Sequence, residues 1–165
     1  MSIGSVISEL QLFSSLIISK EKPVDIAKIT DFESKYKLSL PNDYKFFLTH
    51  FNGINLAGTE TYGIFEADVY PSLESVYIFE HHEVGNPMPD YLIPFSPDGG
   101  GNHYCFDTRY INAESCNIVF WQHDYNYSTS DFPELTHKTF ASWVKEIVID
   151  WTLEEYDHSG NEKLT

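Results

Sequence analysis

The chain has 165 residues, 42% of them hydrophobic and 16% aromatic, which suits one domain with its own core and excludes a disordered chain. Its 10 lysines and arginines stand against 25 aspartates and glutamates, a formal net charge of −15. This balance argues against direct nucleic-acid binding, because affinity for phosphate comes mainly from clustered lysine and arginine. We therefore predict a single domain over residues 1–165, with a core from about residue 25 to residue 156 and no nucleic-acid partner.

The first 19 residues contain no basic stretch, and Glu9 and Gln11 interrupt their apolar positions. We therefore expect neither a signal peptide nor a membrane span, and we expect a cytoplasmic protein. In that compartment Cys105 and Cys116 are expected to be reduced, structural thiols.

Three helices are expected in the first third of the chain. Apolar residues recur every three or four positions in Ile3–Ile18, which predicts an amphipathic helix over that range. A second helix is expected to begin after Asp25, whose side chain can cap it. Its predicted buried stripe consists of Ile26, Ile29, Phe32 and Tyr36.

The third predicted helix begins at Leu40-Pro41, because proline suits the first helical position, and Asp43 complements the helix dipole there. Its predicted apolar face consists of Tyr44, Phe47, Leu48 and Phe51. We expect Asn52-Gly53 to end it as a C-cap.

The middle of the chain changes to short aromatic and β-branched segments. Thr59–Phe65 is predicted to be a strand, whereas Leu73–Glu80 fits either a strand over Val76–Phe79 or a helical turn. Successive antiparallel strands are expected at Tyr91–Ser96, His103–Asp107 and Asn117–Gln122.

A last helix is expected from about Thr139, and residues after Tyr156 are expected to fray. Its predicted apolar face consists of Phe140, Trp143, Val144, Ile147, Val148 and Trp151. Helices, then strands, then a helix predict an α+β fold in which an antiparallel sheet carries N-terminal helices and a C-terminal helix packed against it.

The glycine-rich stretch Asp98–Asn102 connects two of the predicted strands. Glycine accepts a positive φ without steric cost, so this stretch is predicted to be a tight hairpin tip. It does not fit a phosphate-binding loop, because no lysine follows it, the next element is a strand, and Asp98 repels phosphate.

Other polar groups favour structural roles over chemistry. His81-His82-Glu83 is predicted to be a solvated loop tip, because adjacent side chains converge poorly on one metal ion. The residues His103, Asp107, His123 and Asp124 are candidates for a general acid–base group at one sheet end, but no nucleophile is spaced with them. We expect no metal, no cofactor and no catalytic residue.

Acidic residues dominate the stretch from Phe46 to His137, in which Arg109 is the only lysine or arginine among thirteen acids. A negative field of this kind attracts basic partners and speeds their encounter, although it also serves solubility alone. The acids that we predict to contact a partner are Glu66, Asp68, Glu80, Glu83, Asp90, Asp98 and Asp124.

Several motifs together resemble the SUKH superfamily, which contains the fungal cell-wall synthesis regulator and many bacterial immunity proteins. In chain order they are Leu40-Pro-x-x-Tyr44-x-x-Phe47-Leu48-x-x-x-Asn52-Gly53, Ile93-Pro-Phe95, Asp98-Gly-Gly-Gly-Asn102, Tyr104-Cys-Phe-Asp107 and Val119-Phe-Trp121-x-His123-Asp124. The resemblance implies an α+β fold without enzymatic activity and a protein-binding role, most commonly neutralisation of a polymorphic toxin. It also implies that Asp98–Asp107 is a scaffold feature near the binding face.

The first functional hypothesis is therefore an immunity protein that binds a cognate, basic toxin domain, often a nuclease, through its acidic surface. The alternative is a non-catalytic regulatory module that binds an endogenous protein partner. A third hypothesis, a hydrolase that uses the two histidines and two aspartates named above, lacks a nucleophile.

Overall fold

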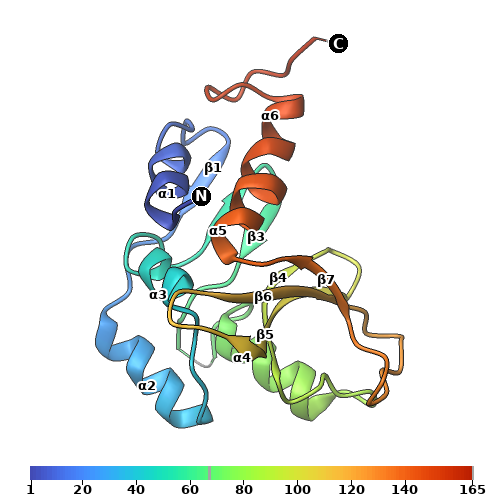
Figure 1. The fold of residues 1–165 in the computed structure, drawn as a ribbon. Coiled ribbons are helices and arrows are strands. Elements are labelled where there is room, and N and C mark those ends of the chain that lie inside the picture. Colours follow the sequence, from blue (N-terminus) through green and yellow to red (C-terminus); the bar gives the residue numbers. More distant parts are fainter. Residues whose placement is uncertain (67, 165) are drawn as a thin grey trace.

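The computed structural model describes residues 1–66 and 68–164 and shows helices gathered around two sheets (Figure 1). The helical segments are α1 (Ile3–Leu10), α2 (Ile26–Tyr36), α3 (Asn42–Leu48), α4 (Leu73–Ile78), the π-helical η1 (Phe79–Glu83), α5 (Phe140–Trp143), the π-helical η2 (Val144–Asp150) and α6 (Trp151–Glu155). The strands are β1 (Ile18–Lys20), β2 (Ile54–Leu56), β3 (Thr59–Thr61), β4 (Leu92–Pro97), β5 (His103–Ile111), β6 (Cys116–Trp121) and β7 (Glu134–His137).

Both sheets are antiparallel and keep the order of the chain, with β1-β2-β3 in the smaller sheet and β4-β5-β6-β7 in the larger one. They meet where the Tyr62 amide donates to the Phe95 carbonyl at 2.8 Å and Ser96 Oγ donates to the Glu60 carbonyl at 2.5 Å. The predicted α+β class, with antiparallel strands and helices packed against them, is confirmed.

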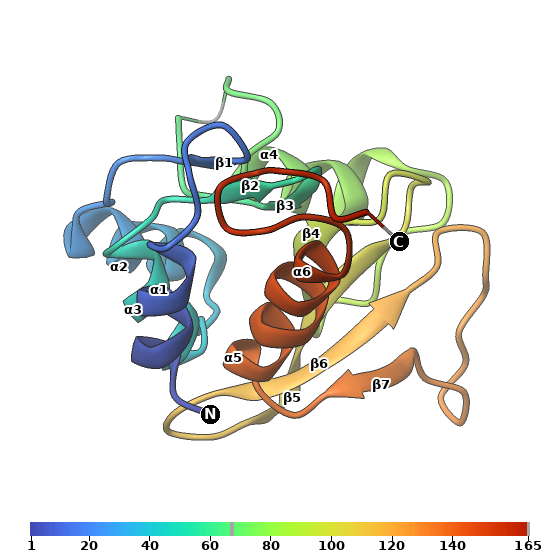
Figure 2. The same ribbon diagram turned by 90° about the horizontal axis from the view of Figure 1, so that it is seen from above.

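The larger sheet separates two apolar layers. The C-terminal helix lies across one face of this sheet, while α4 and η1 lie on the other side (Figures 1 and 2). Under the C-terminal helix, the Phe95 and Phe106 rings stack at 4.3 Å, and Trp143 meets Phe95 edge-on at 4.8 Å. The opposite face holds a smaller buried cluster of Met88, Leu92, Cys105, Val119 and Trp121.

The third helix is where the sequence places it, but its end differs. Asp43 lies in its first turn, and Tyr44, Phe47 and Leu48 are buried in the core. The helix ends at Leu48, so Gly53 is not its C-cap. Gly53 instead has a φ of +96° immediately before β2, where an added Cβ would lie 2.9 Å from the Thr61 carbonyl oxygen.

The first helix is shorter than predicted, because the chain turns after Leu10 and returns as β1. Ile18, expected at the end of that helix, instead pairs with Leu56 in the smaller sheet. An apolar residue at helical spacing can equally cover a core from a strand, so spacing alone did not fix this boundary. The second helix begins after its cap Asp25 as predicted, although Ile26 is exposed.

The three predicted central strands are confirmed as β4, β5 and β6, with shifts of up to four residues at their ends. Three short strands, β1, β2 and β7, were not predicted, and Thr59–Phe65 forms a strand only as far as Thr61. The ambiguous segment Leu73–Glu80 is helical, because Ser72 and Ser75 form a reciprocal capping box at its start.

The chain beyond Tyr156 packs back instead of fraying. The Ser14 amide donates to the His158 carbonyl at 2.8 Å, and the rings of Phe13 and His158 lie 4.6 Å apart. Within the described residues, no helix combines the length and the apolar character that crossing a membrane requires.

Candidate interaction surface

The glycine-rich stretch forms the tip of the β4–β5 hairpin, as predicted. One carboxylate oxygen of Asp98 accepts from the amides of Gly100 and Asn102 at 2.7 and 2.9 Å, and the other accepts from Asn102 Nδ2. Although burial acts in the opposite direction, these bonds hold the pKa of Asp98 below its usual value. The Asp98 carboxylate therefore stays ionised and is bound to the backbone of its own loop.

His123 joins three loops at this end of the larger sheet. Its amide donates to Asn102 Oδ1 of the hairpin tip at 3.1 Å, and its ring Nδ1 lies 2.9 Å from the same oxygen. Its carbonyl accepts from Asn86 Nδ2 at 3.0 Å, in the loop between η1 and β4. These bonds hold the hairpin tip, the η1–β4 loop and the β6–β7 loop together.

Four predicted contact residues lie on these loops or at the η1 boundary, and all four are exposed: Glu83, Asp90, Asp98 and Asp124. Asp98 and Asp124 belong to the two loops that Asn102 and His123 join, whereas Asp90 lies at the opposite end of β4. Glu66 and Asp68 are also exposed, but they lie in the segment before α4, where Glu66 Oε1 is 3.7 Å from Lys28 Nζ of α2. The structure therefore does not gather the predicted acids into one cluster.

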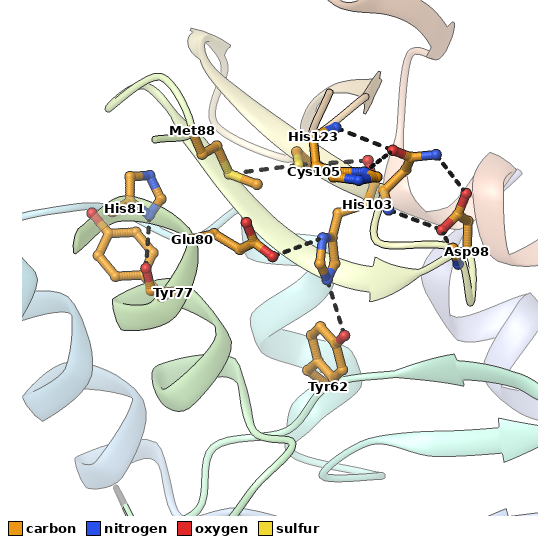
Figure 3. Close-up of polar contacts among 11 residues, drawn as sticks. Tyr62, Tyr77, Glu80, His81, Met88, Asp98, His103, Cys105 and His123 are labelled. Atoms are coloured by element: carbon orange, nitrogen blue, oxygen red, sulfur yellow. Dashed lines mark hydrogen bonds and ion pairs between the residues drawn. The ribbon is translucent and has the colours of Figure 1, made fainter. Parts of the chain in front are cut away.

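Glu80 departs from the prediction of a surface contact, because it is only 6% exposed. It lies in η1 and points toward His103 of β5, with Oε1 3.9 Å from Nδ1 (Figure 3). His103 Nε2 is 3.1 Å from the Tyr62 hydroxyl. Burial raises the pKa of Glu80 and lowers the pKa of His103 to about 4, so His103 is neutral at physiological pH.

The hypothetical acid–base group is not assembled. Asp107 lies four residues along β5 from His103 and accepts two bonds from the Arg109 guanidinium, while His123 lies beside the hairpin tip. The two cysteines are free and buried, and burial raises the pKa of both thiols, which suits structural roles.

His81 and His82 lie within η1, so the predicted solvated loop tip is wrong. The side chain of His81 turns inward, and its Nδ1 is 2.8 Å from the Tyr77 carbonyl oxygen (Figure 3). Among the residues described, no three His, Cys, Asp or Glu side chains are placed to hold a metal ion together.

The exposed acids Asp131 and Glu134 do not belong to the predicted contact set. They flank Phe132-Pro133 where the β6–β7 loop enters the edge strand β7. Their position in the acid-rich stretch is the sequence feature that points to them, but the strand β7 beside them was not predicted.

Comparison with known proteins identifies a family and a shared fold. The family model SUKH_5, described as SMI1-KNR4 cell-wall, matches residues 3–149. Among solved structures, a protein from Pseudomonas syringae pv. tomato is similar at 17% identity and a TM-score of 0.66, over 87% of this chain and 96% of that chain. At this identity the second match shows a shared fold. No curated protein matches the chain.

Proposed function

Because this chain belongs to the SUKH_5, SMI1-KNR4 cell-wall family, we propose that it is an immunity protein that acts in the cytoplasm. In this proposal it binds a cognate polymorphic toxin, a nuclease, and neutralises it by covering the active site. The observation that supports the proposal is the excess of acids over lysine and arginine between Phe46 and His137, where most of the acids are exposed.

Electrostatics supports a nuclease as the partner. A nuclease needs a basic groove for its substrate, and an acidic protein can occupy such a groove in place of the phosphates. The exposed acids Glu83, Asp90, Asp98 and Asp124 supply negative charge at the end of η1, in the η1–β4 loop, at the hairpin tip and in the β6–β7 loop. A stable contact of this kind covers about 800 Å² on each partner, and charge contributes most to the rate of encounter.

A non-catalytic mode of action agrees with the placement of the reactive groups. His103 is buried and neutral, and the Asp107 carboxylate is bound to Arg109. We therefore propose neutralisation by binding alone, with no turnover.

The cell-wall label of the family favours a second candidate, a regulatory module for an endogenous protein. The two candidates differ in their partner, because only an immunity protein requires a toxin gene beside its own.

A rescue experiment tests the proposal. The C-terminal domain of the protein encoded by the adjacent gene is expressed in cells with and without this chain, and survival is measured. We expect the domain to kill cells alone and to spare cells that also contain this chain. A toxic domain that this chain fails to neutralise contradicts the proposal, and a non-toxic binding partner favours the regulatory module.

A further inference from the structure

Arg109, the only lysine or arginine of the acid-rich stretch, lies near the end of β5 and is held there by an ion pair and by aromatic rings. Its Nε and Nη2 donate to Asp107 Oδ1 and Oδ2 at 3.0 and 2.7 Å, and the Asp107 side chain is only 2% exposed. The Arg109 guanidinium also lies 3.9 Å from the ring centre of Tyr91 and 4.3 Å from that of Phe132. Such bidentate and stacked contacts fix an arginine side chain that is otherwise flexible.

The aromatic rings around this arginine reach solvent. The Tyr110 ring centre lies 5.3 Å from the guanidinium, and Tyr110 is 56% exposed. Phe132 is 45% exposed, although it stacks on Arg109. We call Tyr91, Arg109, Tyr110 and Phe132 the arginine–aromatic cluster. It joins the start of β4, the end of β5 and the β6–β7 loop.

This composition is typical of the centre of a protein interface. Tyrosine and arginine are enriched among the interface residues that carry most of the binding energy. Burial of an exposed phenylalanine side chain against a partner adds favourable free energy. Because Arg109 already holds the rings of Tyr91 and Phe132, binding costs less conformational entropy there than at a flexible site.

Charge around the cluster indicates the kind of partner. The negative charge of Asp107 neutralises the positive charge of Arg109. The net charge around the cluster is therefore set by the acids next to its aromatic rings. Asp90 precedes Tyr91, Asp131 precedes Phe132, and Glu134 follows two residues later; all three are exposed. Within the described parts of the chain, none of the three forms an ion pair with lysine or arginine, although Asp131 accepts from the Tyr125 hydroxyl. An apolar centre inside an acidic rim is complementary to a basic protein surface.

We propose that the arginine–aromatic cluster is the docking centre for the toxin domain, a basic protein surface with an apolar side chain at its middle. This inference rests on the proposed function. In the complex, Tyr110 and Phe132 pack against the apolar side chain, while Asp90, Asp131 and Glu134 pair with lysines or arginines of the toxin around it.

The test measures binding of the purified, catalytically inactivated toxin domain from the adjacent gene to variants of this chain. We expect Phe132→Ala and Tyr110→Ala each to weaken binding at least about tenfold. Phe46→Ala is the matched control, because Phe46 is 46% exposed like Phe132 but lies on α3, outside the cluster. We expect this variant to bind the toxin domain as tightly as the wild type does. Thermal unfolding followed by circular dichroism checks that each variant is folded.

Charge reversal gives a second, independent readout. We expect Asp131→Lys to slow association about tenfold, because it opposes basic groups of the partner, and Asp31→Lys on α2 to leave the rate unchanged. A loss confined to Asp131→Lys, with both aromatic variants binding normally, overturns the cluster as the docking centre.

The remaining outcomes separate this inference from the function on which it rests. If the wild type binds and both folded aromatic variants bind equally well, the inference fails and the immunity function stands. If the wild type does not bind the domain, both fail. If the chain is a dimer that Phe132→Ala converts to a monomer, the cluster is a self-interface and the inference is overturned.

Discussion

Single hydrogen bonds explain why the helical motif near residue 50 contains a tyrosine and an asparagine. The Tyr44 hydroxyl donates to the Tyr62 carbonyl at 2.7 Å. Asn52 Nδ2 donates to the Ile64 carbonyl at 2.8 Å, and Asn52 Oδ1 accepts from the Ile64 amide at 2.7 Å. Both side chains therefore hold the segment that leads from the smaller sheet to α4, and neither is free to contact a partner.

We predict that Asn52→Ala lowers the free energy of unfolding by about 2–4 kcal/mol, because it leaves both backbone groups of buried Ile64 without a partner. Asn55→Ala is the control, since exposed Asn55 accepts only one bond, from Gly58, and should cost less than about 1 kcal/mol. Urea denaturation measures both values, and equal losses contradict the assigned role.

His103 should make stability depend on pH. Burial lowers its pKa from 6.5 to about 4, so the unfolded chain binds its proton more readily between these values, and stability falls as pH falls through that window. From about pH 7 to about pH 5 the expected loss is about 2 kcal/mol. Glu80, whose pKa burial raises, acts in the opposite direction.

The comparison that isolates the histidine is His103→Gln, which retains a side chain able to bond the Tyr62 hydroxyl. Urea denaturation at both pH values should show a smaller loss for this variant than for the wild type. Parallel losses would mean that His103 does not carry the effect.

At the scale of elements, one turn occurs twice with the same bonds. In Asp157–Asn161, as in Asp98–Asn102, the aspartate accepts from two backbone amides and from the asparagine side chain. The shared pattern is D-x-x-G-N, and its glycine has a positive φ in both copies, +95° at Gly101 and +90° at Gly160. This recurrence identifies the glycine-rich stretch as a structural turn.

Of the neighbouring glycines Gly100 and Gly101, only Gly101 should lose stability when it is replaced by alanine. We predict that Gly101→Ala lowers the unfolding free energy by about 1–2 kcal/mol, because of its positive φ and a Cβ that would lie 3.0 Å from the His123 ring. Gly100→Ala should change it by less than about 0.5 kcal/mol, because its Cβ would meet Asp98 at an ordinary 3.5 Å. Thermal denaturation measures the stability of both variants. Equal losses would contradict a special structural role for Gly101.

The C-terminal helix shows how an element can depart from a simple period. Trp151 was predicted on the apolar face, but it is 52% exposed. The π-helical segment η2 widens the turn, so the buried position falls on Thr152, whose hydroxyl donates to the Val148 carbonyl at 2.7 Å. A stripe extrapolated with 3.6 residues per turn therefore becomes misaligned beyond Val148.

At the scale of the whole molecule, charge is unevenly distributed. The lysines that pair with acids lie on the N-terminal and C-terminal helices, outside the acid-rich stretch. We predict that association with the toxin domain slows at least about tenfold when ionic strength rises from about 0.05 M to about 0.5 M. Stopped-flow mixing measures this rate. A rate independent of salt contradicts electrostatic steering, even if the affinity is high.

The sequence by itself determined the α+β class, the family motifs, the central strands and the starts of most helices, because caps, turn residues and apolar spacing act locally. Tertiary structure decided where helix α1 ends, that Glu80 is buried beside His103, and that Tyr91, Arg109 and Phe132 meet. These contacts join residues far apart in the chain, so no local pattern encodes them. They depend on how the loops and strands pack together and on which side chains burial then leaves accessible.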